Sequence, residues 1–366
     1  MKRIHVGMWC LDTVSKQNLG TQLRLKMLAD ELKKFNAHCL RMDEKIEENL
    51  TRKEKERNRQ SKMNAIFIAP ENLFCRPLTE DRGFRYGDTR HLNETQKNEI
   101  LRDLKVLSKK YPKMLIIPGS ISWKKPITRP LGTDRPWWKQ LATDNPFAAL
   151  AVPEPSRREK SISRVRANRR TLGIGRDEPL SVALGFVNES TPASTPREKV
   201  THLESATDIA KNTSYVVFNG ELLVKYNKSS DFHEVLDGPG TVFIPGAVAA
   251  RFKCDGMFFG LDICMDNNYA SLQEDASTVD IHILISAATE GEPKNANLKS
   301  GGWFIHCSSN TLYYEFSQLS QRGFTKIKSD AIVKSGDLKC ADIFVLESAA
   351  EVAVVEFMYG AMAEED

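Results

Sequence analysis

No run of about twenty consecutive apolar residues occurs in the chain, so the sequence contains no candidate membrane-spanning helix. The N-terminus also lacks the long apolar region of a cleavable signal peptide, and residues 1–7 instead predict a first strand. The formal net charge of +4 over 366 residues is small and indicates no particular partner. We expect a cytoplasmic protein without membrane contact, although the sequence leaves open export by a route that needs no cleavable signal.

Closely spaced cysteines are missing as well. The chain has seven cysteines, an odd number, and no two of them form a Cys-x-x-Cys pair. Disulfide frameworks and zinc sites need paired or closely spaced cysteines, so this pattern favours a reducing compartment over either of them. We also expect no metal and no cofactor. The seven are Cys10, Cys39, Cys75, Cys254, Cys264, Cys307 and Cys340.

The first third of the chain alternates between strand and helix patterns. Apolar runs predict strands at residues 3–10, 64–71 and 114–120, and apolar residues at helical spacing predict helices at 18–36 and 93–110. The second helix starts at Asn93, and Gln96 three residues later is typical of a capping box. Strands separated by helices indicate a layered α/β architecture.

Residues 125–205 interrupt this alternation. The segment is rich in Pro, Arg, Ser and Thr and contains no core element that its pattern identifies. Structureless loops of this length are uncommon in compact domains, so we interpret the segment as an insertion that is either a lid or partly disordered. The chain is then a single domain, 1–366, with this insertion inside it.

The insertion carries arginine pairs such as Arg157-Arg158, and clustered guanidinium groups suit phosphate. It could therefore bind an anionic substrate or a nucleic acid. Acidic residues such as Glu159 dilute the run and no aromatic residues are interleaved, which favours a solvated basic loop, so we expect no nucleic-acid partner. Trp137 and Trp138 would pack the insertion onto the body of the domain or cover a site.

Strand patterns return after the insertion. Residues 213–218 and 222–226 predict a hairpin because Asn219-Gly220 lies between them. Further apolar runs predict strands at 257–264, 279–286 and 302–307.

Three chemically capable residues each lie at the end of a predicted core strand or just beyond it. They are Glu71, Lys228 and Cys264. Buried cysteines are common, but Cys264 lies where an apolar strand emerges into polar chain, and a nucleophile must be both rigidly held and reachable. A carboxylate and a lysine at matching strand ends would supply a base and a stabiliser of developing negative charge.

In this order and context, the three residues make the chain similar to the nitrilase superfamily of carbon–nitrogen hydrolases. The signature of that family is a Pro-Glu after a strand, a Tyr-x-Lys after a hairpin, and a cysteine in an apolar-Cys-x-Asp context. The corresponding stretches here are Pro70-Glu71, Tyr226-Asn227-Lys228 and Ile263-Cys264-Met265-Asp266. The resemblance covers roughly residues 1–123 and 206–357, and it implies a nitrilase-like αββα sandwich with a long insertion between the third strand and the following hairpin.

The resemblance also implies a role for each residue. Cys264 would be the nucleophile that forms a thioester, Glu71 the general base and acid, and Lys228 the oxyanion stabiliser together with the backbone N–H of Met265. Glu234, the one glutamate between the lysine and the cysteine, would orient the lysine. The expected protein is an amidase-like hydrolase of non-peptide C–N bonds, and a homodimer is expected by analogy alone.

The chain departs from the family pattern in places that bear on the substrate. Many members have an Arg and a Pro-Glu shortly after the cysteine, whereas this chain has Asn267-Asn268-Tyr269. Residues 284–288 lack the Pro and Trp often found there. Two alternatives therefore stay open: a nitrilase that acts on a nitrile, and a catalytically silent binding or regulatory protein that uses the basic insertion.

Overall fold

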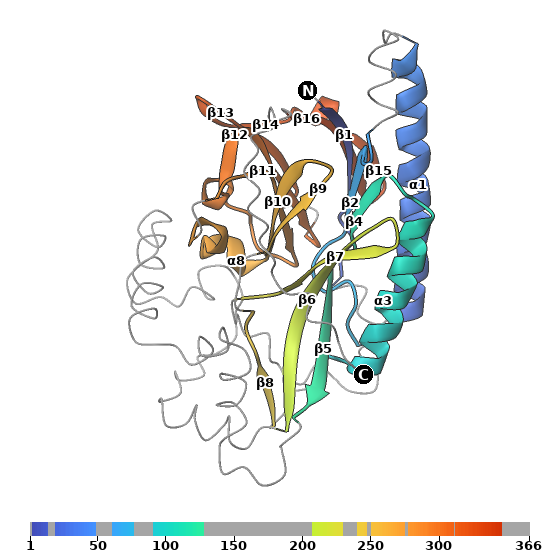
Figure 1. Ribbon diagram of the computed structural model, residues 1–366, viewed down its shortest axis with the longest axis vertical. Helices are drawn as coiled ribbons and strands as arrows, with labels where there is room; N and C mark the ends of the chain where they lie inside the picture. The colour runs from blue at the N-terminus through green and yellow to red at the C-terminus, as the bar shows by residue number, and fades with distance from the viewer. Residues whose placement is uncertain are drawn as a thin grey trace.

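The computed structural model describes residues 2–13, 19–48, 61–76, 91–127, 207–229, 240–246, 250–274, 277–310 and 312–345. In this part of the chain two β-sheets pack face to face, and two long helices cover the outer face of one of them (Figure 1). The predicted α/β sandwich is thereby confirmed. None of the helices described here combines the length and the hydropathy that crossing a membrane would require.

The first sheet contains the N-terminal strands. Its main path runs in the order β15 (Val333–Ser335), β16 (Leu338–Val345), β1 (Lys2–Trp9), β2 (Ala65–Ile68), β4 (Met114–Ile117), β6 (Asp208–Phe218), β5 (Ser120–Pro126) and β3 (Leu92–Asn93). Two further strands, β7 (Glu221–Asn227) and β8 (Thr241–Phe243), pair with β6. Because β1, β2 and β4 are parallel, their carboxyl ends lie at the same edge of the sheet.

The second sheet has six strands. They are arranged in the order β14 (Gly323–Lys326), β13 (Glu315–Ser320), β12 (Leu298–Ser308), β11 (Val279–Ser286), β10 (Met257–Ile263) and β9 (Ala250–Cys254). Its three central strands, β10, β11 and β12, are parallel. Each sheet therefore has a parallel centre, and the loops that follow the strands of each centre gather at one edge.

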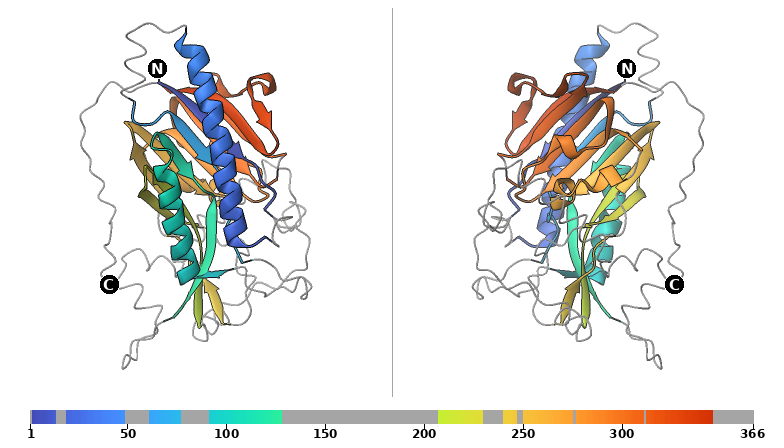
Figure 2. Two further views of the ribbon diagram at one scale, coloured as in Figure 1. Left: turned by 90° about the vertical axis from the view of Figure 1, so that its right-hand side faces the viewer. Right: turned by 90° about the vertical axis from the view of Figure 1, so that its left-hand side faces the viewer.

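Alternation along the strands separates two apolar cores. Ile4 and Ile66 of the first sheet and Leu261 of the second are fully buried in the core between the sheets. Phe67, the residue after Ile66 in β2, points to the opposite face of the sheet. There it packs in a second core with Phe35 of α1 (Thr21–Glu47). Figure 2 (left) shows α1 and α3 (Glu94–Lys109) side by side in front of the first sheet.

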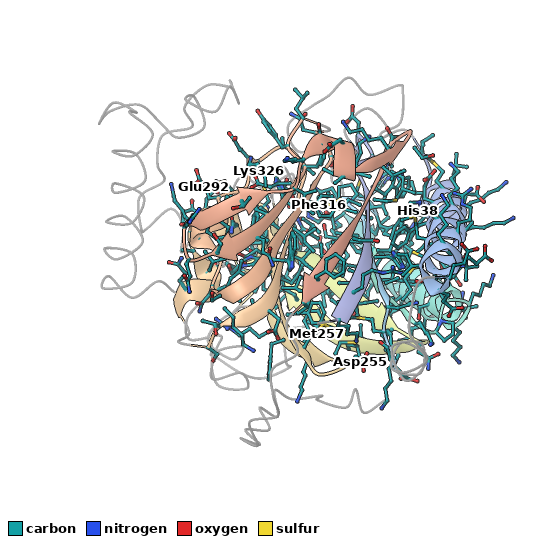
Figure 3. The ribbon with its side chains drawn as sticks, turned by 90° about the horizontal axis from the view of Figure 1, so that it is seen from above. His38, Asp255, Met257, Glu292, Phe316 and Lys326 are labelled. Atoms are coloured by element: carbon teal, nitrogen blue, oxygen red, sulfur yellow. The ribbon has the colours of Figure 1, made fainter. Side chains whose placement is uncertain are left out.

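The outer face of the second sheet is covered differently. The helix that follows β10, α8 (Met265–Asn268), is a single turn, and the remaining described cover consists of loops and the 3₁₀ turns η2 (Ser271–Glu274) and η3 (Pro293–Asn295). A third 3₁₀ turn, η4 (Ser329–Ala331), precedes β15. Seen from above, α1 with His38 lies on one side of the sandwich, and Glu292 and Lys326 lie on the other (Figure 3).

The helices agree with the sequence patterns in position, but one differs in length. The capping box of α3 is confirmed: the Asn93 side chain accepts from Gln96 N at 2.8 Å, and the Gln96 side chain accepts from Asn93 N at 3.0 Å. Helix α1 continues to Glu47, well past the predicted end at residue 36. The apolar pattern thins there, but no glycine or proline stops the helix, and Cys39 keeps one side of this extension buried.

The predicted insertion needs one correction at its start. Lys125 and Pro126 belong to β5, a strand that the sequence patterns missed, and they pair with Ile209 and Asp208 of β6. Strands β5 and β6, which precede and follow the predicted insertion, are therefore neighbours in the sheet. The rest of the insertion, including Trp137 and Trp138, lies outside the described residues.

Candidate active site

The three predicted site residues all follow strands of the parallel centres or the hairpin beside them. Glu71 comes three residues after β2, Lys228 directly after β7, and Cys264 directly after β10. Glu71 and Lys228 are each 1% exposed and Cys264 is 6% exposed. Charged side chains are rarely buried to this extent unless they are paired, so the partners of Glu71 and Lys228 matter.

Glu71 and Lys228 form a direct ion pair. Lys228 Nζ donates to Glu71 Oε1 at 2.8 Å, and Asn212 Nδ2 donates to the same oxygen at 2.9 Å. The second carboxylate oxygen, Oε2, accepts from the backbone N–H of Ala287 at 2.9 Å. Both oxygens of Glu71 are thus held by donors from two different sheets, which fixes the orientation of the carboxylate.

The β6–β7 hairpin explains why Asn212 and Lys228 meet. Asn219 and Gly220 form its turn with φ values of 48° and 86°, the left-handed conformation that such a turn requires. At the open end of the hairpin, Lys228 N donates to Asn212 O at 2.8 Å. Asn212 directly precedes the predicted hairpin strand at 213–218, but its contact with Glu71 could not be predicted from spacing.

Cys264 occupies a strained position between β10 and α8. Its φ is 53° and its ψ is −114°, which L-residues with a side chain rarely adopt. Such a conformation costs about 1–3 kcal/mol and persists only where the surroundings enforce it. Here Cys264 N donates to Ile285 O at 2.8 Å, which anchors the strained residue to the end of β11. The backbone N–H of Met265 is the predicted oxyanion donor, and it donates no hydrogen bond to any of the described residues.

A loop at the end of β11, residues 285–289, joins Glu71 to Cys264. Ile285 O anchors the backbone of Cys264, Ala287 N binds the Glu71 carboxylate, and Thr289 Oγ1 lies 2.7 Å from Cys264 Sγ. Three residues of one five-residue segment therefore hold the carboxylate of Glu71 and both the backbone and the thiol of Cys264. Thr289 gave no signal in the sequence, because its position is set by the fold of this loop.

Buried polar groups brace the same loop from outside. Ser286 Oγ donates to Thr289 O at 3.1 Å and is bonded to His306 Nε2 at 2.8 Å. Burial lowers the pKa of His306 to about 3, so this histidine is neutral at ordinary pH. It therefore holds Ser286 as a neutral hydrogen-bond partner and brings no charge to the site.

Asp266, two residues after Cys264, connects the cysteine turn to the lysine. Its carboxylate accepts from Tyr226 OH at 2.6 Å, from Ser229 N at 3.1 Å and from Ser229 Oγ at 2.9 Å. Tyr226 and Ser229 flank Lys228, so Asp266 fixes the end of β7 beside the cysteine turn. Burial, reinforced by Asp266, raises the pKa of Tyr226 well above its usual value, so the phenol stays protonated and donates.

The structure thus brings together Glu71 and Lys228 in direct contact and ties Cys264 to both through residues 285–289 and Asp266. Glu234 lies outside the described residues. Among those residues, no three His, Cys, Asp or Glu side chains are grouped as metal ligands. The arrangement offers a thiol, a fixed carboxylate and an ammonium group within one buried network, the components of nucleophilic acyl transfer.

No protein-family model matches the chain, and no curated protein matches it either. Solved structures do. An amidase from the nitrilase superfamily of Nesterenkonia AN1 is 10% identical over 95% of this chain and 91% of that chain, with a TM-score of 0.40. A carbon–nitrogen hydrolase from Helicobacter pylori G27 is 11% identical over 93% of this chain and 89% of that chain, with a TM-score of 0.41.

A third similar structure belongs to a longer chain, of which the match covers less than half. A glutamine-dependent NAD⁺ synthetase from Acinetobacter baumannii is 10% identical over 93% of this chain and 45% of that chain, with a TM-score of 0.39. These three solved structures are an amidase, a synthetase and a carbon–nitrogen hydrolase, and at TM-scores near 0.4 the likenesses decide nothing about the activity of this chain.

Proposed function

We propose that the chain is a member of the nitrilase superfamily and a thiol-dependent hydrolase of non-peptide C–N bonds, with an amide as substrate. The observation that carries the proposal is the loop 285–289, which contacts the Glu71 carboxylate and the Cys264 thiol at once. A buried glutamate–lysine pair costs free energy of desolvation, so its connection to a strained cysteine through one short segment favours a chemical role over a purely structural one.

The reaction would begin with proton transfer from Cys264 to Glu71. Oε2 of Glu71 accepts one hydrogen bond from Ala287 N, and a carboxylate oxygen has a second lone pair with which it can take the thiol proton. The Thr289 hydroxyl, 2.7 Å from Sγ, would donate to the thiolate that remains. The thiolate then attacks the amide carbon, forming the C–S bond as the C=O π electrons move to oxygen.

The negative charge on that oxygen needs donors. Lys228 and the backbone N–H of Met265 would supply them in this proposal. When the tetrahedral intermediate collapses, the C–N bond breaks and Glu71 returns its proton to the leaving amine, which leaves a thioester on Cys264. Glu71 would next take a proton from water, whose oxygen attacks the thioester, and the proton finally returns to the thiol as the acid departs.

Three parts of this proposal rest on analogy. Glu234 would orient Lys228, the insertion at 125–205 would border the site within one domain, and two copies of the chain would form a homodimer. Size-exclusion chromatography with light scattering tests the last part: a monomer at micromolar concentration would contradict it.

Turnover of a panel of amides, carbamoyl compounds and nitriles tests the reaction. Acrylamide and butyramide, each found in complex with a variant of the Nesterenkonia amidase, are suitable first compounds. We expect ammonia release from an amide that Cys264→Ala abolishes, whereas Cys75→Ala, a matched buried cysteine, retains activity. Turnover of nitriles alone would instead identify a nitrilase, and no turnover of any compound would favour a silent binding protein.

Thiol alkylation gives an independent readout. Burial raises the pKa of Cys254 to about 11 and that of Cys340 to about 12, and it also raises the pKa of Cys39 and Cys307. Iodoacetamide at pH 7.5, a condition chosen for the test, should therefore modify Cys264 much faster than these four, as followed by peptide mass spectrometry. Equal rates at all five would contradict an activated thiol.

A further inference from the structure

Four lysines converge on one tryptophan on the helix-covered face of the first sheet. Lys97 comes from the first turn of α3, Lys125 from β5, Lys211 from β6 and Lys225 from β7, and Trp123 of β5 lies among them. We call these four residues the lysine cluster. Four separate elements supply it, so it is a product of the tertiary fold and leaves no trace as a basic run in the sequence.

Strand register places the three sheet lysines on one face. Trp123 pairs with Lys211 across β5 and β6, and Lys125, two residues along β5, points to the same face as Trp123. Lys225 pairs with Tyr215, which lies on that same face of β6. Lys97 Nζ approaches to 4.2 Å from the centre of the Trp123 ring, and Lys225 Nζ to 6.0 Å.

The charge of this cluster is poorly compensated. Glu94 lies 3.9 Å from Lys97, but Lys125, Lys211 and Lys225 form no ion pair with any of the described residues. The opposite face of the same strands provides a contrast, because there Lys124 is paired with Asp208 at 3.4 Å. Of the two neighbouring lysines of β5, Lys124 therefore has a carboxylate partner on its face of the sheet, whereas Lys125 has none among the described residues on the other face.

Two further observations show how unfavourable this grouping is without a counter-charge. Burial, followed by the charges of Lys225, Lys125 and Lys97, lowers the pKa of Lys211 to about 8. Lys97 is buried in the first turn of α3, where the helix dipole disfavours a cation. The ring of Trp123 offsets part of this cost for Lys97 through a cation–π contact.

We propose that the lysine cluster binds a small anion that carries at least two phosphate groups. Ammonium groups act as point charges on phosphate, and several of them around one position suit an anion with more than one negative charge. Trp123 is only 2% exposed, with Lys97 against its ring, so no open aromatic face is present for a nucleobase to stack on. This inference does not depend on the proposed hydrolase activity.

Calorimetric titration of the full chain with inorganic pyrophosphate at constant ionic strength tests the site. We expect saturable binding of one pyrophosphate per chain that weakens about tenfold or more in Lys125→Met/Lys225→Met. Lys124→Met removes a lysine from the opposite face and should leave the affinity unchanged. Equal weakening in both variants, or no saturable binding to the unmodified chain, would overturn the proposal.

Chemical labelling of Lys211 tests the same site without a substitution in it. Because its pKa is lowered, Lys211 should react with acetic N-hydroxysuccinimide ester faster than Lys124 near pH 8, and pyrophosphate should protect Lys211 but not Lys124. Glu94→Gln, which removes the neighbouring carboxylate, should tighten pyrophosphate binding. Unchanged labelling of Lys211 at saturating pyrophosphate, or weaker binding by Glu94→Gln, would contradict the proposal.

Discussion

The two faces of the first sheet each hold a buried charged network, and the two networks differ in exposure. On the inner face, Glu71 and Lys228 are both 1% exposed. On the outer face, His5 is 2% exposed, but its partners Asp43 and Asp342 have side chains that are 34% and 22% exposed. One network is sealed between the sheets, whereas the other reaches solvent through its carboxylates.

The outer network connects three elements. His5 of β1 is bonded to Asp342 of β16 at 2.6 Å and to Asp43 of α1 at 3.0 Å, and Arg3 also pairs with Asp43. Solvent screens these contacts, so each one adds modestly to stability. The attraction between the two charges of the inner pair is far stronger, because the pair is shielded from solvent. Neither charge can be solvated instead, so each one needs the other as its partner. The difference separates a network that joins elements from one that lies in the proposed active site.

The largest expected effect is therefore on the inner face. Lys228→Met leaves the Glu71 carboxylate buried without its ion-pair partner, and breaking such a pair costs about 3–5 kcal/mol. We expect this loss in the free energy of unfolding measured with urea, together with loss of any amidase activity. The matched control is Lys124→Met: its pair with Asp208 is partly exposed and should contribute about 0–1 kcal/mol. Similar losses in both variants would remove the distinction between the faces.

The sequence predicted the strands and helices of the sandwich better than it predicted which strands pair with one another. The hairpin at Asn219-Gly220 and the capping box of α3 are local, and each is confirmed where its pattern placed it. The pairing of β1 with β16 joins the two ends of the described chain, and no local pattern contains it. Strand β5 was missed because it has few apolar residues: Ile121 and Trp123 alternate with serines, and its second half, Lys124-Lys125-Pro126, resembles the start of a polar loop.

The residues of the candidate site likewise fall into those that the sequence predicted and those that it did not. Glu71, Lys228 and Cys264 could be selected because each residue follows a strand, and their roles stay a prediction. Asn212, Asp266 and Thr289 make their contacts through tertiary structure. Asp266 is part of the signature around Cys264, but its contacts with Tyr226 and Ser229 could not be predicted from it. Asn212 and Thr289 are of residue types that are ordinary in strands and turns, so sequence alone gave no reason to assign them a contact with the site.

A smaller effect is expected from Thr289→Val, which keeps the shape of the side chain and removes the hydroxyl beside Cys264 Sγ. A hydrogen bond to a charged group contributes about 1.5–3 kcal/mol, so kcat should fall by roughly 10- to 100-fold. The pH dependence of kcat should also shift to higher pH, because the thiolate loses a donor. Thr13→Val, which alters a contact with the Glu71 backbone instead, is the control. An unchanged pH profile in Thr289→Val would leave Thr289 with a structural role only.

The outer network should make the stability of the fold depend on pH. Burial lowers the pKa of His5, but the hydrogen bonds with Asp342 and Asp43 and their charges together raise it above the ordinary value of 6.5. The folded chain then holds a proton that the unfolded chain releases, so this stabilisation is complete below pH 6.5 and is lost as pH rises through the folded pKa. The free energy of unfolding should fall over that range, and His5→Gln should abolish the slope.

His38 is the other histidine near this network, and it acts in the opposite direction. Burial, followed by the charge of His5, lowers the pKa of His38, so its contribution to stability increases with pH and is confined to pH values near and below 6.5. The two histidines can therefore be distinguished by the sign of the slope. A His5→Gln variant that keeps the fall in stability above pH 6.5 would show that another group causes it.

The smallest expected effect is that of Asp43→Asn. The side chain is one-third exposed, so removing its charge should lower the free energy of unfolding by at most about 1 kcal/mol at pH 6, where His5 is protonated. At pH 9 the difference from the unmodified chain should shrink, because the contact with a neutral His5 no longer depends on charge and the pair with Arg3 alone remains. Urea unfolding at the two pH values measures both quantities. A loss as large as that of Lys228→Met would mean that exposure does not distinguish the two networks, since solvent screening is the reason that Asp43→Asn should be mild.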